Sequence, residues 1–288
     1  MWRIYRITEE IKGKMNPHLS HFHLYPIFVK LTSTKSCNYS TRLLFFRPII
    51  MAIEDSVRKI IVHSLSKISE FDGYKKFDGV VNPEHFKEMM KKDPAFSPFS
   101  LDRDKYVIAR IGGNLITSIH RKLGDLYEEI IIELLHEKYK FEKSYLKYSL
   151  DIVIDGKEQE RTTDGRIILS DVQDIQSREK VEQLIIGDYE GLALEVRSCY
   201  QIGDSKRIQA DEHMATALKQ LNVEPKLVIM CNTSLVSPVK RLKKHWTVYQ
   251  GKESFDFIHQ LTDFNLYDFL MDNQNLIVPL MDDVFEML

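Results

Sequence analysis

Two acidic residues beside strand-like segments are the strongest chemical signal in this sequence. Asp164 precedes an apolar run at 166–169, and Glu195 lies inside a second apolar run at 191–197. Short apolar runs bounded by turn residues predict buried strands. Carboxylates held at one point by such strands can share a cation, and their hard oxygen ligands suit Mg²⁺. We therefore expect a magnesium site at Asp164 and Glu195, with Val196 as a further ligand.

The strand around Glu195 also carries a cation toward these acids. Alternation along a strand places Glu195 and Arg197 on one face, with Leu194 and Val196 on the other. Phosphodiester hydrolysis uses a divalent ion to neutralise charge on the phosphate and a nearby cation to position the attacking water. Asp164, Glu195 and Arg197 form a minimal set for that reaction. The spacing alone is a weak signal, and surface charges at strand ends are the alternative.

A basic segment, Gly203-Asp-Ser-Lys-Arg-Ile-Gln-Ala-Asp211, follows this strand and predicts a loop that opens a helix. Asp204 or Ser205 is the expected N-cap. Lys206 and Arg207 fall in the first turn, where the helix dipole disfavours cations, but where free N–H groups make a phosphate site. We expect DNA contacts from Lys206, Arg207 and Gln209; the alternative is a solvated helix start. Four residues are expected to face inward: Ile208, Ala215, Leu218 and Leu221.

The segments T-D-G-R and L-E-V-R-S-C-Y-Q-I-G-D-S-K-R-I-Q-A-D together resemble type II restriction endonucleases of the PD-(D/E)XK superfamily, most closely the ApaLI-like group. The resemblance covers roughly residues 105–250. It implies a mixed central sheet flanked by helices and Mg²⁺-dependent cleavage of double-stranded DNA at a palindromic site. It also implies a homodimer, and we expect a cognate DNA methyltransferase in the same host.

The sequence departs from the superfamily pattern at two positions. Thr163 replaces the usual proline before the first acid, and Arg197 replaces the usual lysine two residues after the glutamate. Arginine stays protonated, so it cannot accept a proton, although it can hold a phosphate. Either Arg197 supplies the electrostatic part of the lysine's role, or Lys206 reaches in from the helix. The direction along the strand favours Arg197.

Glu128 is a candidate third carboxylate, because an acid on an early helix often joins the metal site in this superfamily. The helical pattern at 114–140 has one face with Lys122, Asp125, Glu129 and Glu133. Glu128 instead projects among apolar residues, namely Ile131, Ile132 and Leu135, where an unpaired carboxylate is costly. It is therefore either a metal ligand with a catalytic role or the partner of a basic residue from another segment.

A second basic cluster follows the strand expected at 226–231 and is also expected to contact DNA: Lys240, Arg241, Lys243 and Lys244. Trp246 could support this cluster by packing. A solvated basic turn is an equal alternative. Arg110, His120, Arg121 and Lys122 border the Glu128 helix as further candidates for phosphate contacts.

Hydrophobic periodicity predicts a mixed α/β fold with a helical N-terminal part. Residues 51–145 are mainly helical, with the strongest patterns at 53–69 and 114–140, and Gly112-Gly113 is expected as a flexible start of the second helix. Four strands are expected, at 150–154, 166–169, 191–197 and 226–231, and residues 246–249 are a candidate for a fifth. Helices are expected between them, at 205–221 and 253–270. This alternation predicts a mixed sheet covered by helices.

Residues 1–50 differ from the rest in charge. They hold eight basic and two acidic residues, so their net charge is +6 and the remainder carries −8 of the total of −2. Met51 begins a pattern that is typical of an amphipathic helix. We expect either a dispensable basic extension at 1–50 or a segment that belongs to the fold. Residues 51–288 form one catalytic domain in this interpretation, with an α/β core at 146–250 and a helical part at 251–288.

The composition excludes few classes of protein. The chain is 43% hydrophobic and 28% charged, without an overall basic charge, so DNA contacts must come from local patches. Cys37, Cys199 and Cys231 are unpaired by count and spacing, which favours a reducing cytoplasm. The absence of an 18-residue apolar run argues against a membrane span. Two alternatives to restriction remain: a non-catalytic DNA-binding module on the same fold, and a structure-specific repair nuclease.

Overall fold

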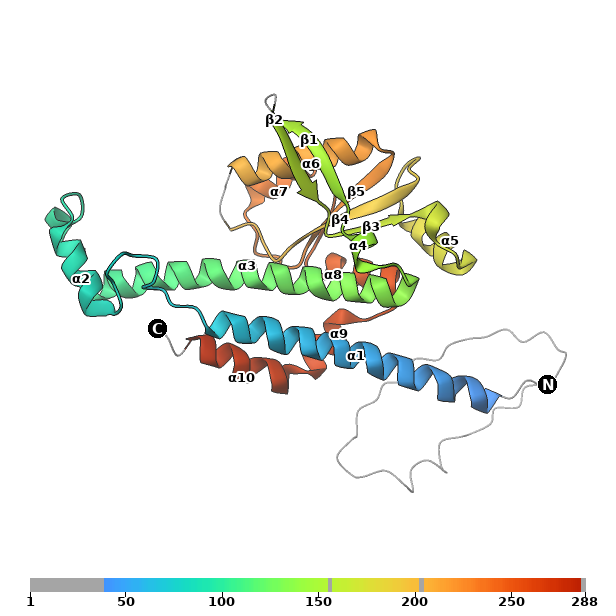
Figure 1. Cartoon of the computed structure of the whole chain (residues 1–288), viewed down its shortest axis with the longest axis horizontal. Coiled ribbons are helices and arrows are strands. Elements are labelled where there is room, and N and C mark those ends of the chain that lie inside the picture. Colours follow the sequence, from blue (N-terminus) through green and yellow to red (C-terminus); the bar gives the residue numbers. More distant parts are fainter. Residues whose placement is uncertain (1–38, 155–156, 202–204, 286–288) are drawn as a thin grey trace, which may run out of the picture. The chain divides into compact units, whose positions relative to one another are not determined.

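The computed structural model describes residues 39–154, 157–201 and 205–285 (Figure 1). Internal contacts divide the chain into two units, Met1–Leu44 and Phe45–Leu288. The second unit contains the sheet and all the candidate site residues. No described helix combines the length and apolarity needed to cross a membrane.

The helices and strands follow one another in this order: α1 (Tyr39–Ser69), α2 (Pro83–Lys92), α3 (Asp104–Tyr139), α4 (Lys143–Leu146), β1 (Ser149–Ile154), β2 (Lys157–Thr162), β3 (Gly165–Ile168), α5 (Ile175–Leu184), β4 (Gly191–Arg197), α6 (Ser205–Gln220), β5 (Val223–Ile229), α7 (Val236–Leu242), β6 (Thr247–Gln250), α8 (Lys252–Thr262), α9 (Leu266–Asp272) and α10 (Gln274–Phe285). The expected class, a mixed α/β fold with a helical N-terminal part, is confirmed.

A four-stranded mixed sheet, in the order β3-β4-β5-β6, forms the centre of the second unit. β3 pairs antiparallel with β4, whereas β4–β5 and β5–β6 are parallel. β1 and β2 form a separate antiparallel hairpin. Gly191 opens β4 because a Cβ there would lie 2.3 Å from the main-chain oxygen of Ile167. The glycine therefore permits the close approach of β3 and β4 that brings Asp164 to Glu195.

Helices α3 and α6 cover opposite faces of this sheet (Figure 1). One core packs Leu194 and Val196 of β4 against α3, together with α1 and the C-terminal helices. A second core packs Ala193 of β4 against α6, β1 and Trp246. Burial on both faces explains why the other residues of β4 and β5 are apolar, although each strand also carries one acid and one base.

The structure corrects several expected boundaries. Met51 lies inside α1, which starts at Tyr39, so it does not open the helix. Gly112 and Gly113 lie inside α3, because burial of neighbours such as Ile111 outweighs the cost of about 1 kcal/mol per glycine. The helix expected at 253–270 is broken into α8 and α9, since Asp263 adopts a left-handed conformation with φ 61°. Leu221 is 48% exposed because α6 ends just before it.

Candidate active site

Asp164 lies directly before β3 and is almost buried. Its main-chain N–H donates to the oxygen of Leu194 at 2.9 Å, which extends the β3–β4 pairing by one residue. Its carboxylate Oδ2 accepts a hydrogen bond from the N–H of Val196 at 2.8 Å. The backbone of β4 therefore fixes both ends of this residue.

The predicted faces of β4 are confirmed. Leu194 and Val196 point into the core beneath α3, whereas Arg197 points toward α6, where its Nη2 donates to Oδ1 of Asp211 at 3.1 Å. Glu195 is 6% exposed and forms an ion pair with the same Nη2. Strand alternation thus presents an acid and a base together, as the sequence indicates.

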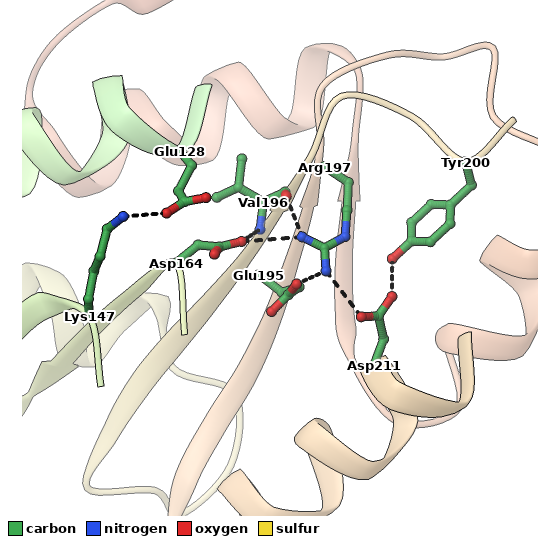
Figure 2. A network of polar contacts seen from close by, with 8 residues as sticks. All are labelled: Glu128, Lys147, Asp164, Glu195, Val196, Arg197, Tyr200 and Asp211. Atoms are coloured by element: carbon green, nitrogen blue, oxygen red, sulfur yellow. Dashed lines mark hydrogen bonds and ion pairs between the residues drawn. The ribbon is translucent and has the colours of Figure 1, made fainter. Parts of the chain in front are cut away.

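The Arg197 guanidinium lies among acids from three different elements (Figure 2). Its Nη1 donates to the main-chain oxygen of Val196 at 2.9 Å and lies 3.4 Å from Oδ2 of Asp164. Its Nη2 contacts the carboxylates of Glu195 and Asp211. Oxygens of Asp164, Glu195 and Val196, the three residues expected to hold a metal, therefore contact a single cationic group.

Negative charge exceeds positive charge in this cluster. Asp164, Glu195 and Asp211 share one guanidinium. Burial raises the pKa of Asp164, Arg197 opposes that shift and the charge of Glu128 adds to it, so that the pKa is about 6. Hard oxygen donors with surplus negative charge fit a divalent cation. Among the described residues, no three side chains of His, Cys, Asp or Glu are grouped so that they could hold a metal ion. A metal bound by Asp164 and Glu195 would therefore need the Val196 carbonyl as its third donor.

Glu128 projects from α3 toward the same cluster, as Figure 2 shows. Lys147 pairs with its carboxylate at 2.6 Å, so the expected basic partner from another segment is present. The charge of Glu128 raises the pKa of Asp164, so Glu128 lies near the expected metal site. Glu133, expected on a polar face with Glu129, is instead buried between Ser56 and Lys143, because α1 packs against that side of α3.

A cleft of about 610 Å³ opens beside Val196 and Arg197. Residues of α3 form one wall, among them His120, Arg121 and Glu128, and Arg207 of α6 contributes to the other. A larger cavity of about 870 Å³ lies between α8 and α9, and its walls contain none of the predicted site residues. The chemistry therefore points to the smaller cleft.

The basic start of α6 is confirmed as a helix, which begins at Ser205. Asp204, the other expected N-cap, lies outside the described residues. Lys206, Arg207 and Gln209 are exposed, and Arg207 borders the cleft. The contacts to Asp164 and Glu195 described above come from Arg197.

The second basic cluster lies on α7 and the turn that follows it. All four of its members are exposed: Lys240, Arg241, Lys243 and Lys244. Arg241 makes two contacts of 2.5 Å with the carboxylate of Glu212 on α6, so part of this cluster's charge is already paired. Trp246 is buried, and its Nε1 donates to the main-chain oxygen of Asp211 at 2.9 Å. It supports the cluster from within the core.

Sequence interpretation did not select Asp211 or Tyr200. Asp211 is 5% exposed, and its Oδ2 accepts a hydrogen bond from the Tyr200 hydroxyl at 2.7 Å. A signal was available, because Asp211 lies three residues after Ile208 and four before Ala215, on the inward face of α6. An acid on an apolar helix face is the same pattern that selected Glu128.

His120, which the sequence indicated only as a candidate for phosphate contacts, belongs to a second polar cluster. Its Nδ1 lies 3.1 Å from the Cys199 sulfur, and its Nε2 lies 2.6 Å from Nε2 of Gln201. Burial lowers the pKa of His120 and raises that of the Cys199 thiol to about 11. At neutral pH both groups are therefore uncharged. Cys199 and Cys231 are free thiols, as the count predicted, and Cys37 lies outside the described residues.

No protein-family model matches this sequence, and no curated protein or solved structure matches it significantly.

Proposed function

We propose that this protein is a type II restriction endonuclease, which uses Mg²⁺ to hydrolyse phosphodiester bonds of double-stranded DNA at a palindromic site. One observation carries the proposal. Oxygens of Asp164, Glu195 and the Val196 main chain contact one cationic group, in a cluster where negative charge remains in excess.

In this proposal Asp164, Glu195 and the Val196 carbonyl hold Mg²⁺, with Glu128 as a further acid. The ion would neutralise charge that develops on the reacting phosphate. Arg197 cannot serve as a proton acceptor, so its role is to hold the scissile phosphate and stabilise its charge. Its contact with the main chain and with three carboxylates already fixes its orientation.

The exposed cations around the cleft support a DNA path. Arg121 and Arg207 border the cleft from α3 and α6. Lys206, beside Arg207, and the lysines of α7 and the turn after it would add phosphate contacts, because α6 and α7 pack together. Contacts of this kind position the duplex, whereas base recognition requires other groups in the grooves.

Several finer features belong to the same proposal. The mixed sheet with helices on both faces supports a restriction-endonuclease-like fold. A palindromic target matches a two-fold symmetric homodimer. A cognate DNA methyltransferase would protect host DNA, and both proteins would act in the cytoplasm.

Arg197 also favours a second candidate, a DNA-binding module without nuclease activity. Its guanidinium contacts both acids that would hold the metal. A chain that had exchanged metal for arginine would bind DNA without cutting it. The surplus acid charge favours the nuclease instead, since one guanidinium shared by three carboxylates leaves the cluster negative.

The test is incubation of the purified protein with unmodified DNA of mixed sequence and Mg²⁺, followed by sequencing of the ends. EDTA and the variant Asp164→Asn serve as controls. We expect discrete fragments with one repeated end sequence, and none in either control. Binding without cleavage supports the second candidate, and random ends support a structure-specific nuclease. Cleavage that persists in EDTA or in Asp164→Asn overturns the assigned site.

A further inference from the structure

We propose that Asp211 is the counter-ion of Arg197 and that it keeps the carboxylates of Asp164 and Glu195 available for a divalent cation. Asp211 is thus a positioning residue that acts through Arg197. The inference rests on the metal site of the proposed function.

Asp211 is held on the α6 side of Arg197 by hydrogen bonds of its own. One carboxylate oxygen accepts from the Tyr200 hydroxyl at 2.7 Å, and the other accepts from Nη2 of Arg197 at 3.1 Å. The indole of Trp246 also donates to its main-chain oxygen. Ile208, Ala215 and Trp246 of the second core surround this residue, and its carboxylate lies between Tyr200 and Arg197.

The arrangement divides the charge of one guanidinium between two sides. Nη1 faces Asp164 and the Val196 carbonyl, and Nη2 is shared between Glu195 and Asp211. Without the charge of Asp211, the guanidinium would be neutralised by Asp164 and Glu195 alone. A cation would then compete with an arginine bound more tightly to both of its ligands.

This division also accounts for arginine in place of lysine. A guanidinium presents several N–H groups in a rigid planar fork, whereas an ammonium is a compact point charge. Arg197 can therefore contact Asp211 and the two metal acids together. A lysine at this position would be drawn to the two acids of β3 and β4, and Asp211 would lose its partner.

The experiment measures Mn²⁺ binding to the full chain without DNA, by electron paramagnetic resonance of the free ion. Asp211→Asn keeps the shape and removes the charge: the amide oxygen can still accept from Arg197, and the amide nitrogen can donate to the Tyr200 hydroxyl oxygen. We expect its Mn²⁺ affinity to fall by roughly ten-fold or more. Glu212→Gln is the matched control, because it removes the same charge one residue further along α6, where Glu212 pairs with exposed Arg241. We expect that control to bind like the wild type.

A rescue variant separates the counter-ion role from a structural one. In Arg197→Gln/Asp211→Asn the competing cation is also gone, so Mn²⁺ affinity should return toward the wild-type value. Should Asp211→Asn fail to fold, Arg197→Lys carries the test, and its Mn²⁺ affinity should likewise fall. Three outcomes would overturn this inference but leave the metal site standing. They are equal Mn²⁺ affinity of wild type and Asp211→Asn, an equal loss of affinity in Glu212→Gln, and no recovery of affinity in the double variant. A wild-type protein that binds no Mn²⁺ overturns the metal site as well.

Discussion

The sheet contains two Glu-x-base sequences on neighbouring parallel strands, and their surroundings differ. Glu195-Val-Arg197 lies on β4, and Glu224-Pro-Lys226 lies on β5. The β4–β5 register pairs Leu194 with Lys226, so the charged residues of the two strands face opposite sides of the sheet. Glu224 and Lys226 are both buried, whereas Arg197 is half-buried and lines the cleft.

The pair on β5 is electrically balanced. Lys226 lies 2.9 Å from Glu224 and donates to the main-chain oxygen of Leu184 at 2.7 Å. The Glu224 carboxylate also accepts from Thr247 and from the N–H of Ile186. One acid meets one base, and the remaining hydrogen-bonding positions are occupied by the fold. Burial lowers the pKa of Lys226, and its hydrogen bond and ion pair with Glu224 oppose that shift.

On β4, in contrast, three acids meet one base, and burial holds the pKa of Asp164 at about 6. An imbalance of this size costs stability unless another cation binds. The comparison teaches that the motif alone does not identify a metal site. The number of acids for each base, and the presence of a cleft, distinguish the two strands.

The largest expected effect comes from removing acids on the two strands. Asp164→Ala and Glu195→Ala should each abolish Mg²⁺-dependent cleavage, a loss on the order of 10³-fold or more, without a large fall in melting temperature. Glu224→Ala should do the opposite. It leaves Lys226 buried without its acid, which costs about 3–5 kcal/mol of folding free energy, while the folded fraction still cuts.

Cleavage assays and thermal melting on the same three preparations check this prediction. The contrast between the strands fails if Glu224→Ala is inactive while still folded. It also fails if either β4 variant cuts DNA at a substantial rate.

The next effect concerns the cation of β4. Arg197→Ala should lower the single-turnover rate at saturating enzyme by several powers of ten, because it removes a contact to the charged transition state. Arg197→Lys should retain or regain activity at saturating Mg²⁺. Lys206→Ala should chiefly weaken DNA binding and flatten its salt dependence, since one phosphate contact releases about one counterion.

Single-turnover conditions remove binding differences from the measured rate. An inactive Lys206→Ala beside an active Arg197→Ala would exchange the two roles. The lysine would then act from α6, and the β4 cluster would resemble the structural pair of β5.

A smaller effect is expected in stability against pH. The folded pKa of Asp164, about 6, lies above its ordinary value of 3.8, so the folded protein holds this proton more tightly than the unfolded chain. Stability from this group is present below about pH 4 and is lost as the pH rises through 6. Asp164→Asn lacks this loss, so its stability relative to wild type should rise by on the order of 2 kcal/mol between pH 4 and 7.5.

Urea unfolding at both pH values without divalent ions measures this difference. Asp256→Asn, which changes an exposed acid paired with Lys252, is the control and should show no such trend. A gap between wild type and Asp164→Asn that does not change with pH would mean that the β4 cluster is as balanced as the β5 pair.

The sequence predicted the part of the site that depends on local periodicity. The faces of Glu195 and Arg197 follow from strand alternation, and the inward position of Ile208 follows from helical spacing. β2 was missed because its residues, Lys157–Thr162, include no apolar side chain, and only its pairing with β1 defines it. Partners from distant segments, such as Lys147 for Glu128, depend on tertiary packing, which spacing does not encode.

The same reason explains the neglect of Asp211 and of the β5 pair. Whether a buried acid is balanced depends on which bases the fold brings to it, from strands and helices far apart in the chain. Arg197 and Asp211 are 14 residues apart, and Glu224 meets Thr247 across 23. Local patterns identify buried charges, whereas charge balance requires the three-dimensional structure.

The smallest expected effect comes from the basic N-terminal segment, which carries a charge of +6. The described buried residues of α1, from Val57 to Ile68, all follow Met51. A chain that begins at Met51 should therefore fold and cut like the full chain. If the acid excess on β4 belongs to residues 51–288 alone, the Mg²⁺ concentration for half-maximal cleavage should also stay within about two-fold of the full chain's value.

A chain that begins at Phe45, the start of the second unit, is the matched control. An insoluble or inactive Met51 chain beside an active Phe45 chain would place residues 45–50 within the fold. A clear shift in the Mg²⁺ requirement would mean that cations of the N-terminal segment help to balance the β4 acids. The difference in charge balance between β4 and β5 would then be smaller than residues 45–288 alone indicate.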